Sequence, residues 1–242
     1  MIEIRHSDEP GLGWVQREYS ESMNYDDMVQ LDSLYAWVFR LLDLRPGSML
    51  LDAACGRSQL VDMALKRGVT GFGADYAFAP IQELVQSKAG DYLTADGEQL
   101  PFKSNTFETI TSMGSLEHYV HIDQGIREIA RVLTPGGQAL IFVPNTFSLF
   151  HNVYMSMKTG YMLDDGQPLQ RYGTRSQWEQ LIRKNGLEIS SVHKYEREFP
   201  VYWKDLLYYL KNPKKLVYLM LTPFLPINLA MCFAFVCTKE RG

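Results

Sequence analysis

The chain has 242 residues, of which 46% are apolar and 21% charged, and its formal net charge at pH 7 is -4. This length and composition fit a single globular domain and exclude an intrinsically disordered protein. The acidic balance argues against broad binding to a nucleic-acid backbone, so no nucleic-acid partner is expected.

The three cysteines, Cys55, Cys232 and Cys237, lack the spacing of a metal site, so we expect no metal and free thiols in a reducing compartment. The segment Met1–Pro10 carries charges and no apolar run, which argues against a secretory leader. These two observations predict a cytoplasmic protein.

One uncharged stretch, Leu216–Cys237, has the length to span a bilayer, but Pro223 and Pro226 interrupt it. We interpret it as a short helix, a proline turn and a buried strand. Peripheral membrane contact through residues 206–229 stays open as an alternative.

The first part of the chain alternates helices and strands, the pattern of a parallel sheet covered on both faces. Leucines at helical spacing predict an opening helix, which the Arg45-Pro46-Gly47 turn would end. One later helix, with Pro80 in its first turn, should have Ile81, Leu84 and Val85 on its apolar face. The predicted elements are helix Asp27–Leu44, strand Met49–Ala53, helix Gln59–Arg67, strand Val69–Ala74, the Pro80 helix, strand Asp91–Ala95 and strand Phe107–Met113.

The second part continues the alternation with two breaks. We expect Asp123 to cap a helix that Pro135-Gly136-Gly137 ends. Ser176 and Glu179 have the spacing of a capping box, which predicts another helix with Gly186 as its C-cap. The remaining elements are strand Gln138–Val143, an insertion rich in Phe, Tyr and Met over 145–173, strand Leu187–Tyr195, an irregular segment over 196–229 and strand Met231–Thr238.

Ligands of open α/β sheets bind beyond the carboxyl ends of the strands, so the residues after each strand are the candidates for a site. After the first strand comes DAACGRS, in which Gly56 lets the backbone approach a ligand closely. Asp75 ends the second strand, 75 − 52 = 23 residues after Asp52. That is near the separation of about 20 residues at which an acidic side chain accepts hydrogen bonds from a ribose. Together these features favour a nucleoside site over an ordinary strand–helix turn.

A more specific signal follows the third strand, where the chain reads ADGEQLPFKSNTFE from Ala95. The Asp96 carboxylate could accept a hydrogen bond from an exocyclic amine, and the Gly97 N–H could reach a ring nitrogen. Leu100 and Phe102 would pack beside this site or in the core.

Five segments stand in the order and spacing of one known family. They are LLDAACGRS from Leu50, GADYA from Gly73, ADGEQLPFKSNTFE from Ala95, MGSLEHY from Met113 and EIARVLTPGGQALIFVPN from Glu128. With them the sequence resembles class I S-adenosylmethionine-dependent methyltransferases, in the group that methylates small molecules and lipids. The resemblance implies an α/β, Rossmann-like fold. Its seven-stranded, mostly parallel sheet would have helices on both faces, an antiparallel last strand and substrate-cap insertions.

The resemblance also implies the cofactor, S-adenosyl-L-methionine, with S-adenosyl-L-homocysteine as its product. The implied contacts are Asp52, Ala54 and Gly56 for the amino-acid end, Asp75 for the ribose with Tyr76 beside it, Asp96 and Gly97 for the adenine, and Gly114 and Ser115 for the sulfonium side.

One position departs from the family, whose glycine loop usually ends in a second glycine where this chain has Ser58. If the loop requires a positive φ there, serine is costly, and cofactor binding would be weak or the loop remodelled. This leaves open a non-catalytic S-adenosylmethionine-binding protein with a regulatory or assembly role. A nicotinamide-dependent oxidoreductase is disfavoured because Ala54, Gly56 and Gln59 stand where its glycines belong.

Methyl transfer requires an acceptor aligned with the methyl group, and a hydroxyl or amine acceptor also needs a proton acceptor. Glu117 and His118, after the fourth strand, are the candidate catalytic residues, with His121 nearby. For His118 a structural role is the favoured alternative.

The whole chain, 1–242, is interpreted as one methyltransferase domain. Its parts are a helical cap at 1–47, a cofactor-binding core at 48–143, cap insertions at 144–174 and 196–229, and a final strand at 231–238. Because loops carry specificity, the cap segments should form the acceptor pocket, and their apolar character favours a small or lipid-like acceptor methylated on oxygen or nitrogen. The aromatic candidates are Tyr19, Tyr25, Tyr154, Tyr161, Tyr172, Tyr202 and Trp203.

Overall fold

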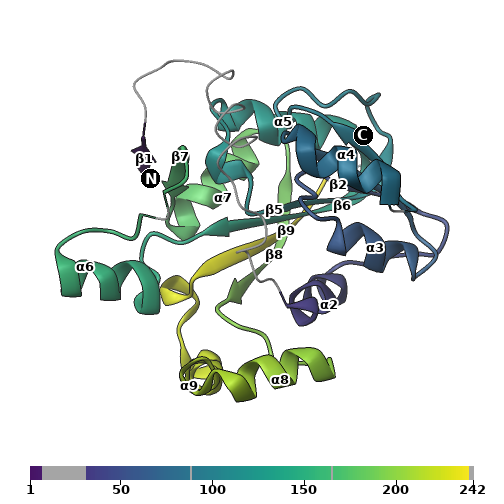
Figure 1. The fold of residues 1–242 in the computed structure, drawn as a ribbon. Helices are drawn as coiled ribbons and strands as arrows, with labels where there is room; N and C mark the ends of the chain where they lie inside the picture. The colour runs from purple at the N-terminus through teal and green to yellow at the C-terminus, as the bar shows by residue number, and fades with distance from the viewer. Residues whose placement is uncertain (7–30, 88, 165, 240–242) are drawn as a thin grey trace.

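The computed structural model describes residues 1–6, 31–87, 89–164 and 166–239. These residues contain a seven-stranded sheet in the order β4-β3-β2-β5-β6-β9-β8 (Figure 1). Neighbouring strands run parallel, except that β9 is antiparallel to both β6 and β8. The Rossmann-like sheet with an antiparallel last strand is therefore confirmed. The strands are β2 (Met49–Asp52), β3 (Thr70–Asp75), β4 (Asp91–Thr94), β5 (Phe107–Met113), β6 (Leu133–Pro144), β8 (Glu188–Tyr195) and β9 (Cys232–Thr238).

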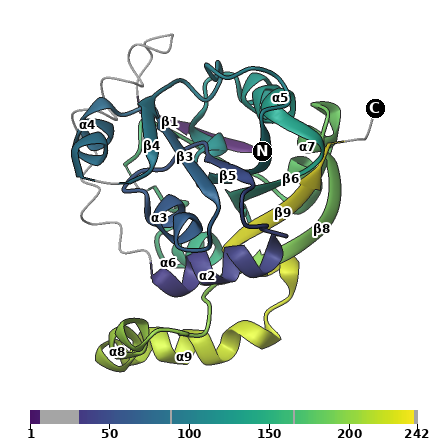
Figure 2. The same cartoon turned by 90° about the vertical axis from the view of Figure 1, so that its right-hand side faces the viewer.

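Helices cover both faces of the sheet because successive side chains of a strand point to opposite faces. Leu50 of β2 belongs to the apolar cluster of α2 (Asp32–Leu41) and α3 (Gln59–Leu65). Its neighbour Leu51 belongs to the cluster of α5 (Ile122–Val132) and α7 (Arg175–Lys184). The two pairs of helices lie on opposite sides of the sheet in Figure 2.

The helix α4 (Phe78–Ser87) lies beside β4 at one end of the sheet (Figure 2). It has Pro80 in its first turn as predicted, and it packs Ile81 and Leu84 against Val61. The prediction that Val85 shares this apolar face is wrong, because the Val85 side chain is 59% exposed. The helix buries only a narrow stripe, since α3 and β4 cover one side of it.

Two predicted helix ends are displaced. The helix α2 ends at Leu41 rather than Leu44, because the backbone of Leu42 is already extended; the predicted start at 27–30 lies outside the described residues. The helix α5 ends at Val132, ahead of Pro135, and the Pro-Gly-Gly turn lies within β6, which begins at Leu133. The register of the β5–β6 pair shifts there, which accommodates the turn within the strand.

The predicted caps of α5 and α7 are also wrong. Asp123 lies inside the first turn of α5, and its carboxylate accepts hydrogen bonds from Asn185 (2.9 Å) and Lys184 (3.0 Å) at the end of α7. The capping box of α7 is formed by Thr174 and Gln177, which have the predicted spacing two residues earlier. The predicted Gly186 stands just after α7 with a φ of 92°.

Both segments predicted as breaks contain regular structure. The first contains a π-helical turn over Leu149–Val153, the helix α6 (Tyr154–Thr159) and the strand β7 (Leu169–Tyr172). The strand β7 pairs antiparallel with β1 (Ile2–Arg5), a strand that the sequence did not predict.

The second segment, predicted as irregular apart from one short helix, contains the helices α8 (Trp203–Lys211) and α9 (Pro213–Leu221). They form a hairpin that projects from one face of the molecule in both views (Figures 1 and 2). Asp205 of α8 is buried and accepts hydrogen bonds from the N–H (2.7 Å) and hydroxyl (2.5 Å) of Ser33, which docks the hairpin on the start of α2. In the part of the chain that is described, every helix is too short or too polar to cross a bilayer.

Candidate functional site

The turn after β2 has left-handed backbone at two positions. Gly56 has a φ of 47° and Ser58 a φ of 65°. Ser58 is fully buried, and its N–H donates to the Cys55 carbonyl at 2.7 Å. Ser58 therefore adopts the conformation that favours glycine, at a cost of about 1–2 kcal/mol. The departure from the family pattern stores strain at Ser58.

Asp75, at the end of β3, holds this turn closed. Its carboxylate accepts hydrogen bonds from the N–H groups of Gly56 and Ala77, both at 2.9 Å. Burial raises the pKa of Asp75, and these N–H groups oppose the rise. The Tyr76 N–H is a third donor to this carboxylate, which has about four acceptor positions, so one remains for a ribose hydroxyl.

Asp52 ends β2 and is 3% exposed. It accepts a hydrogen bond from the Thr111 hydroxyl of β5 at 2.9 Å, and the N–H of the half-buried Ala54 also faces it. Burial raises the pKa of Asp52 to about 7, the charge of Asp75 adds to the rise, and the hydrogen bonds oppose it. Sequence reasoning missed Thr111, because a threonine in a buried strand has no motif of its own.

Asp96 and Gly97 follow β4 at the same edge of the sheet. Asp96 is half-buried and accepts a hydrogen bond from the Glu98 N–H at 2.8 Å, and burial raises its pKa. The pKa of Tyr76 is raised to about 12, first by burial and then by the charges of Asp96 and Glu98. Tyr76 and Asp96, from neighbouring strands, therefore lie within electrostatic reach of each other.

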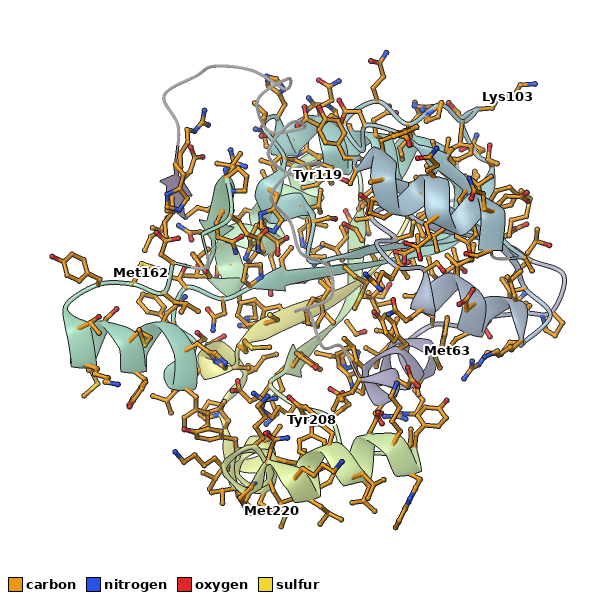
Figure 3. The ribbon with its side chains drawn as sticks, viewed as in Figure 1. Met63, Lys103, Tyr119, Met162, Tyr208 and Met220 are labelled. Carbon is orange, nitrogen blue, oxygen red and sulfur yellow. The ribbon has the colours of Figure 1, made fainter. Side chains whose placement is uncertain are left out.

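Tyr119 is a second residue that sequence reasoning missed. A Cβ atom added to Gly97 would collide with the Tyr119 hydroxyl, so that side chain lies directly against Gly97. Burial raises the pKa of Tyr119, a hydrogen bond with Ser115 opposes the rise, and the charges of Asp75 and Asp96 add to it. Tyr119 thus stands among residues that follow β3, β4 and β5 (labelled in Figure 3). Its only sequence signal is its place at the end of MGSLEHY.

Gly114 and Ser115 follow β5. Gly114 is exposed, with a φ of 64°, and a Cβ atom there would have only a Glu117 oxygen nearby, at 3.7 Å. The Ser115 hydroxyl is buried and lies 2.7 Å from that of Ser112. The left-handed turn at Gly114 therefore leaves open space beside the Glu117 carboxylate.

The two candidate catalytic residues differ in their surroundings. Glu117 is 4% exposed, and its Oε1 lies 3.9 Å from the His118 Nε2. The His118 Nδ1 lies 2.6 Å from the Leu169 carbonyl, to which it donates, and so fastens this turn to β7. Arg171 of β7 also donates to the Tyr119 carbonyl. These contacts support the structural interpretation of His118.

Other predicted residues lie at the border of this cluster or away from it. His121 pairs with Glu98 at 2.7 Å and keeps 62% of its side chain exposed. Across the described ranges, no three His, Cys, Asp or Glu side chains are grouped as metal ligands. Among the aromatic candidates for an acceptor pocket, Tyr172 is buried, Tyr154, Tyr161, Tyr202 and Trp203 are exposed, and Tyr19 and Tyr25 lie outside the described residues.

Residues 51–141 match a family model described as a methyltransferase domain. The chain is 35% identical over 106 residues to a probable tRNA methyltransferase 9B of Bos taurus, covering 43% of this chain and 23% of that protein. It is 31% identical over 140 residues to a demethylmenaquinone methyltransferase of Streptomyces griseus, covering 54% of this chain and 61% of that protein. The chain thus spans less than two thirds of the length of these relatives.

Among solved structures, the [4+2]-cyclase SpnF superposes with a TM-score of 0.62 at 22% identity, over 87% of this chain and 82% of that one. At this identity the likeness establishes the fold alone. The family match, which contains three of the five segments in full, confirms the resemblance to class I methyltransferases.

Proposed function

We infer that this chain is a class I S-adenosylmethionine-dependent methyltransferase, and we propose a small, partly apolar organic acceptor methylated on oxygen or nitrogen. One observation carries the inference. The ends of β2, β3 and β4 bring Asp52, Asp75 and Asp96 to one edge of the sheet, inside the segment that matches the methyltransferase family, and Asp75 holds the Gly56 turn. This is the edge at which open α/β sheets bind ligands.

The residues present fit the chemistry of this cofactor, which supplies a methyl group on a sulfonium for in-line transfer. The Asp96 carboxylate would accept a hydrogen bond from the adenine amine, and the Asp75 carboxylate would accept one from the ribose hydroxyls. Asp52, with the Gly56 turn, would face the ammonium of the amino-acid end. Tyr119, against Gly97, would bound the adenine side. The three carboxylates therefore match the three donor groups of one ligand.

Glu117 is the proton acceptor that we propose. Its carboxylate is buried and faces the open side of Gly114, where the sulfonium is expected. His118 would act on Glu117 from 3.9 Å as a positioning residue, because its other ring nitrogen is held by Leu169. A buried carboxylate near the reacting centre can take the proton of a hydroxyl or ammonium acceptor.

The proposed acceptor class rests on two supports. One relative is named for demethylmenaquinone, an apolar small molecule, and it shares the longer alignment of the two described above. The chain's net charge of -4 disfavours a tRNA backbone, although another relative is named for tRNA.

Cofactor binding is tested by thermal unfolding with S-adenosylmethionine, S-adenosylhomocysteine or NAD in large excess. At 100 times its dissociation constant a ligand adds roughly 2.7 kcal/mol, or about 5–10 °C at this size. Asp96→Ala should abolish the shift, whereas Asp91→Ala, at the exposed opposite end of β4, should keep it. A shift with NAD alone, or equal shifts in both variants, would contradict the assignment.

Catalysis is tested by transfer of a labelled methyl group to quinols, phenols and tRNA. We expect label in a phenolic or quinol acceptor, and Glu117→Gln should lower the rate about 10²-fold or more while cofactor binding survives. Label in tRNA alone would overturn the acceptor class. Cofactor binding without transfer to any acceptor would instead support the non-catalytic alternative.

A further inference from the structure

We propose that the hairpin of α8 and α9 docks this protein on the surface of an anionic phospholipid bilayer. More than half of the large apolar side chains that are exposed in the described chain lie between Phe199 and Phe224. We call this set the hairpin surface. Its most exposed members are Trp203 (70%), Val217 (59%), Met220 (59%) and Phe224 (84%). An apolar surface gathered in this way marks an interaction site rather than a scatter of single side chains.

The helices α8 and α9 leave these side chains exposed. The hairpin is held to the body by its inner side, where Tyr209 and Leu219 are buried and Asp205 is bonded to Ser33. In Figure 3 Tyr208 is labelled on the side toward the sheet and Met220 on the outer side. The outer side therefore carries the apolar groups away from the core.

The charges of the hairpin identify the partner. Between Phe199 and Phe224 the basic residues are Lys204, Lys211, Lys214 and Lys215, and the single acidic residue, Asp205, is completely buried. The solvent-facing charge of this segment is thus entirely positive, in a chain whose net charge is -4. Apolar side chains together with lysines and an exposed Trp form the pattern of a surface that lies in the headgroup region of an anionic bilayer.

The position at which the hairpin joins the sheet gives a functional reason for membrane docking. It leaves β8 at Tyr195 and returns to β9 at Cys232, which pair with each other at one end of the two strands. In β6, Pro144 pairs with Cys232, so this end is the carboxyl edge of the parallel strands, where the candidate site lies. The hairpin therefore joins the sheet at the same edge as the candidate site, where, on the proposed function, a lipid-soluble acceptor would enter.

Sedimentation of the full chain with lipid vesicles tests the proposal and needs neither cofactor nor acceptor, so it stands apart from the proposed function. We expect binding to phosphatidylcholine vesicles containing about a third phosphatidylglycerol, and at least about tenfold weaker binding to phosphatidylcholine alone. Trp203 emission should shift to shorter wavelength with the anionic vesicles, and Trp203→Phe should remove that shift. Absence of binding to anionic vesicles would overturn the proposal.

Matched variants distinguish vesicle binding by the hairpin surface from nonspecific vesicle binding by other exposed side chains. Val217→Glu should weaken vesicle binding about tenfold or more, whereas Val85→Glu, the same change on α4 at the same 59% exposure, should leave it unchanged. Replacing Lys211 and Lys214 by Gln should weaken binding about tenfold or more, since each lysine near an anionic surface contributes roughly fivefold.

The charge control replaces Lys66 and Lys103, which are exposed elsewhere, and should bind like the parent chain. Circular dichroism at the binding temperature confirms that each variant is folded. Equal losses in the test and control variants would refute a specific surface. So would a concentration-dependent dimer in sedimentation velocity that Val217→Glu breaks, because a second copy would then cover the hairpin.

Discussion

Replacing Asp52 by Asn should change how the stability of the ligand-free protein depends on pH. The pKa of Asp52 is raised from 3.8 to about 7, chiefly by burial. In the unfolded chain the carboxyl loses its proton near pH 4, and in the folded chain near pH 7. Stability from this group is therefore complete below about pH 4 and is lost as pH rises through about 7. Three pKa units at about 1.4 kcal/mol each set an upper bound of about 4 kcal/mol.

The amide that Asp52→Asn introduces would stay neutral at every pH, and its oxygen could still accept the Thr111 hydroxyl bond. Its NH2 group would lack the acceptor that it needs, at a cost of about 1–3 kcal/mol. Relative to the parent, the variant should therefore gain up to about 2.6 kcal/mol between pH 5 and pH 8, and it should be the more stable protein at pH 8.

Urea unfolding of both proteins at pH 5, 6, 7 and 8 gives the free energies of unfolding, and their difference cancels the titration of every other group. Asp91→Asn serves as the exposed control. A difference that stays constant across this range would refute the reasoning. The same variant should bind S-adenosylmethionine more weakly, because a neutral amide attracts the ammonium less than a carboxylate does.

Three further substitutions test the strained turn, the hairpin dock and the adenine side. Ser58→Gly should raise the free energy of unfolding by about 0.5–1 kcal/mol, because it relieves a φ of 65°, while Asn105→Gly at a φ of 58° should gain less, since Asn tolerates this region. Asp205→Ala should lower the free energy of unfolding by about 1–3 kcal/mol in urea, because the amide and hydroxyl at the start of α2 lose a buried carboxylate. Gly97→Ala should abolish the thermal shift with S-adenosylmethionine, because the new Cβ displaces Tyr119, and an unchanged shift would place the adenine elsewhere.

The sequence predicts most of the sheet because glycine, proline and polar turn residues mark where the strands begin and end. The strand Phe107–Met113 has the predicted ends, since Asn105 and Thr106 precede it and Gly114 follows it. Helix caps are harder to predict, because several nearby polar residues can cap a helix, and contacts with distant residues decide which one does. Asp123 has the chemistry of a cap but is held by Lys184 and Asn185, more than fifty residues away in the sequence.

The strand pair β1–β7 has no local signal of any strength. Ile4 of β1 pairs with Gln170 of β7, which is far away in the sequence, and each of the two strands has only four residues. Yet this pair supports the candidate site, because β7 supplies the Leu169 carbonyl to His118 and the Arg171 guanidinium to the carbonyl of Tyr119. Sequence motifs find the residues that meet a ligand, and they do not find the partners that hold those residues.

The carboxylates that the sequence motifs identify are residues that lower the stability of the fold. Asp52, Asp75 and Asp96 all have a raised pKa, and in each case burial is the largest cause. Packing for stability alone would place apolar side chains at these buried strand ends, as β6 and β9 do along most of their length. Buried polar residues that cost stability are candidates for ligand contact, and three carboxylates at one edge of the sheet favour a ligand rich in hydrogen-bond donors. A nucleoside with a free hydroxyl pair and an ammonium group, as in S-adenosylmethionine, would supply such donors.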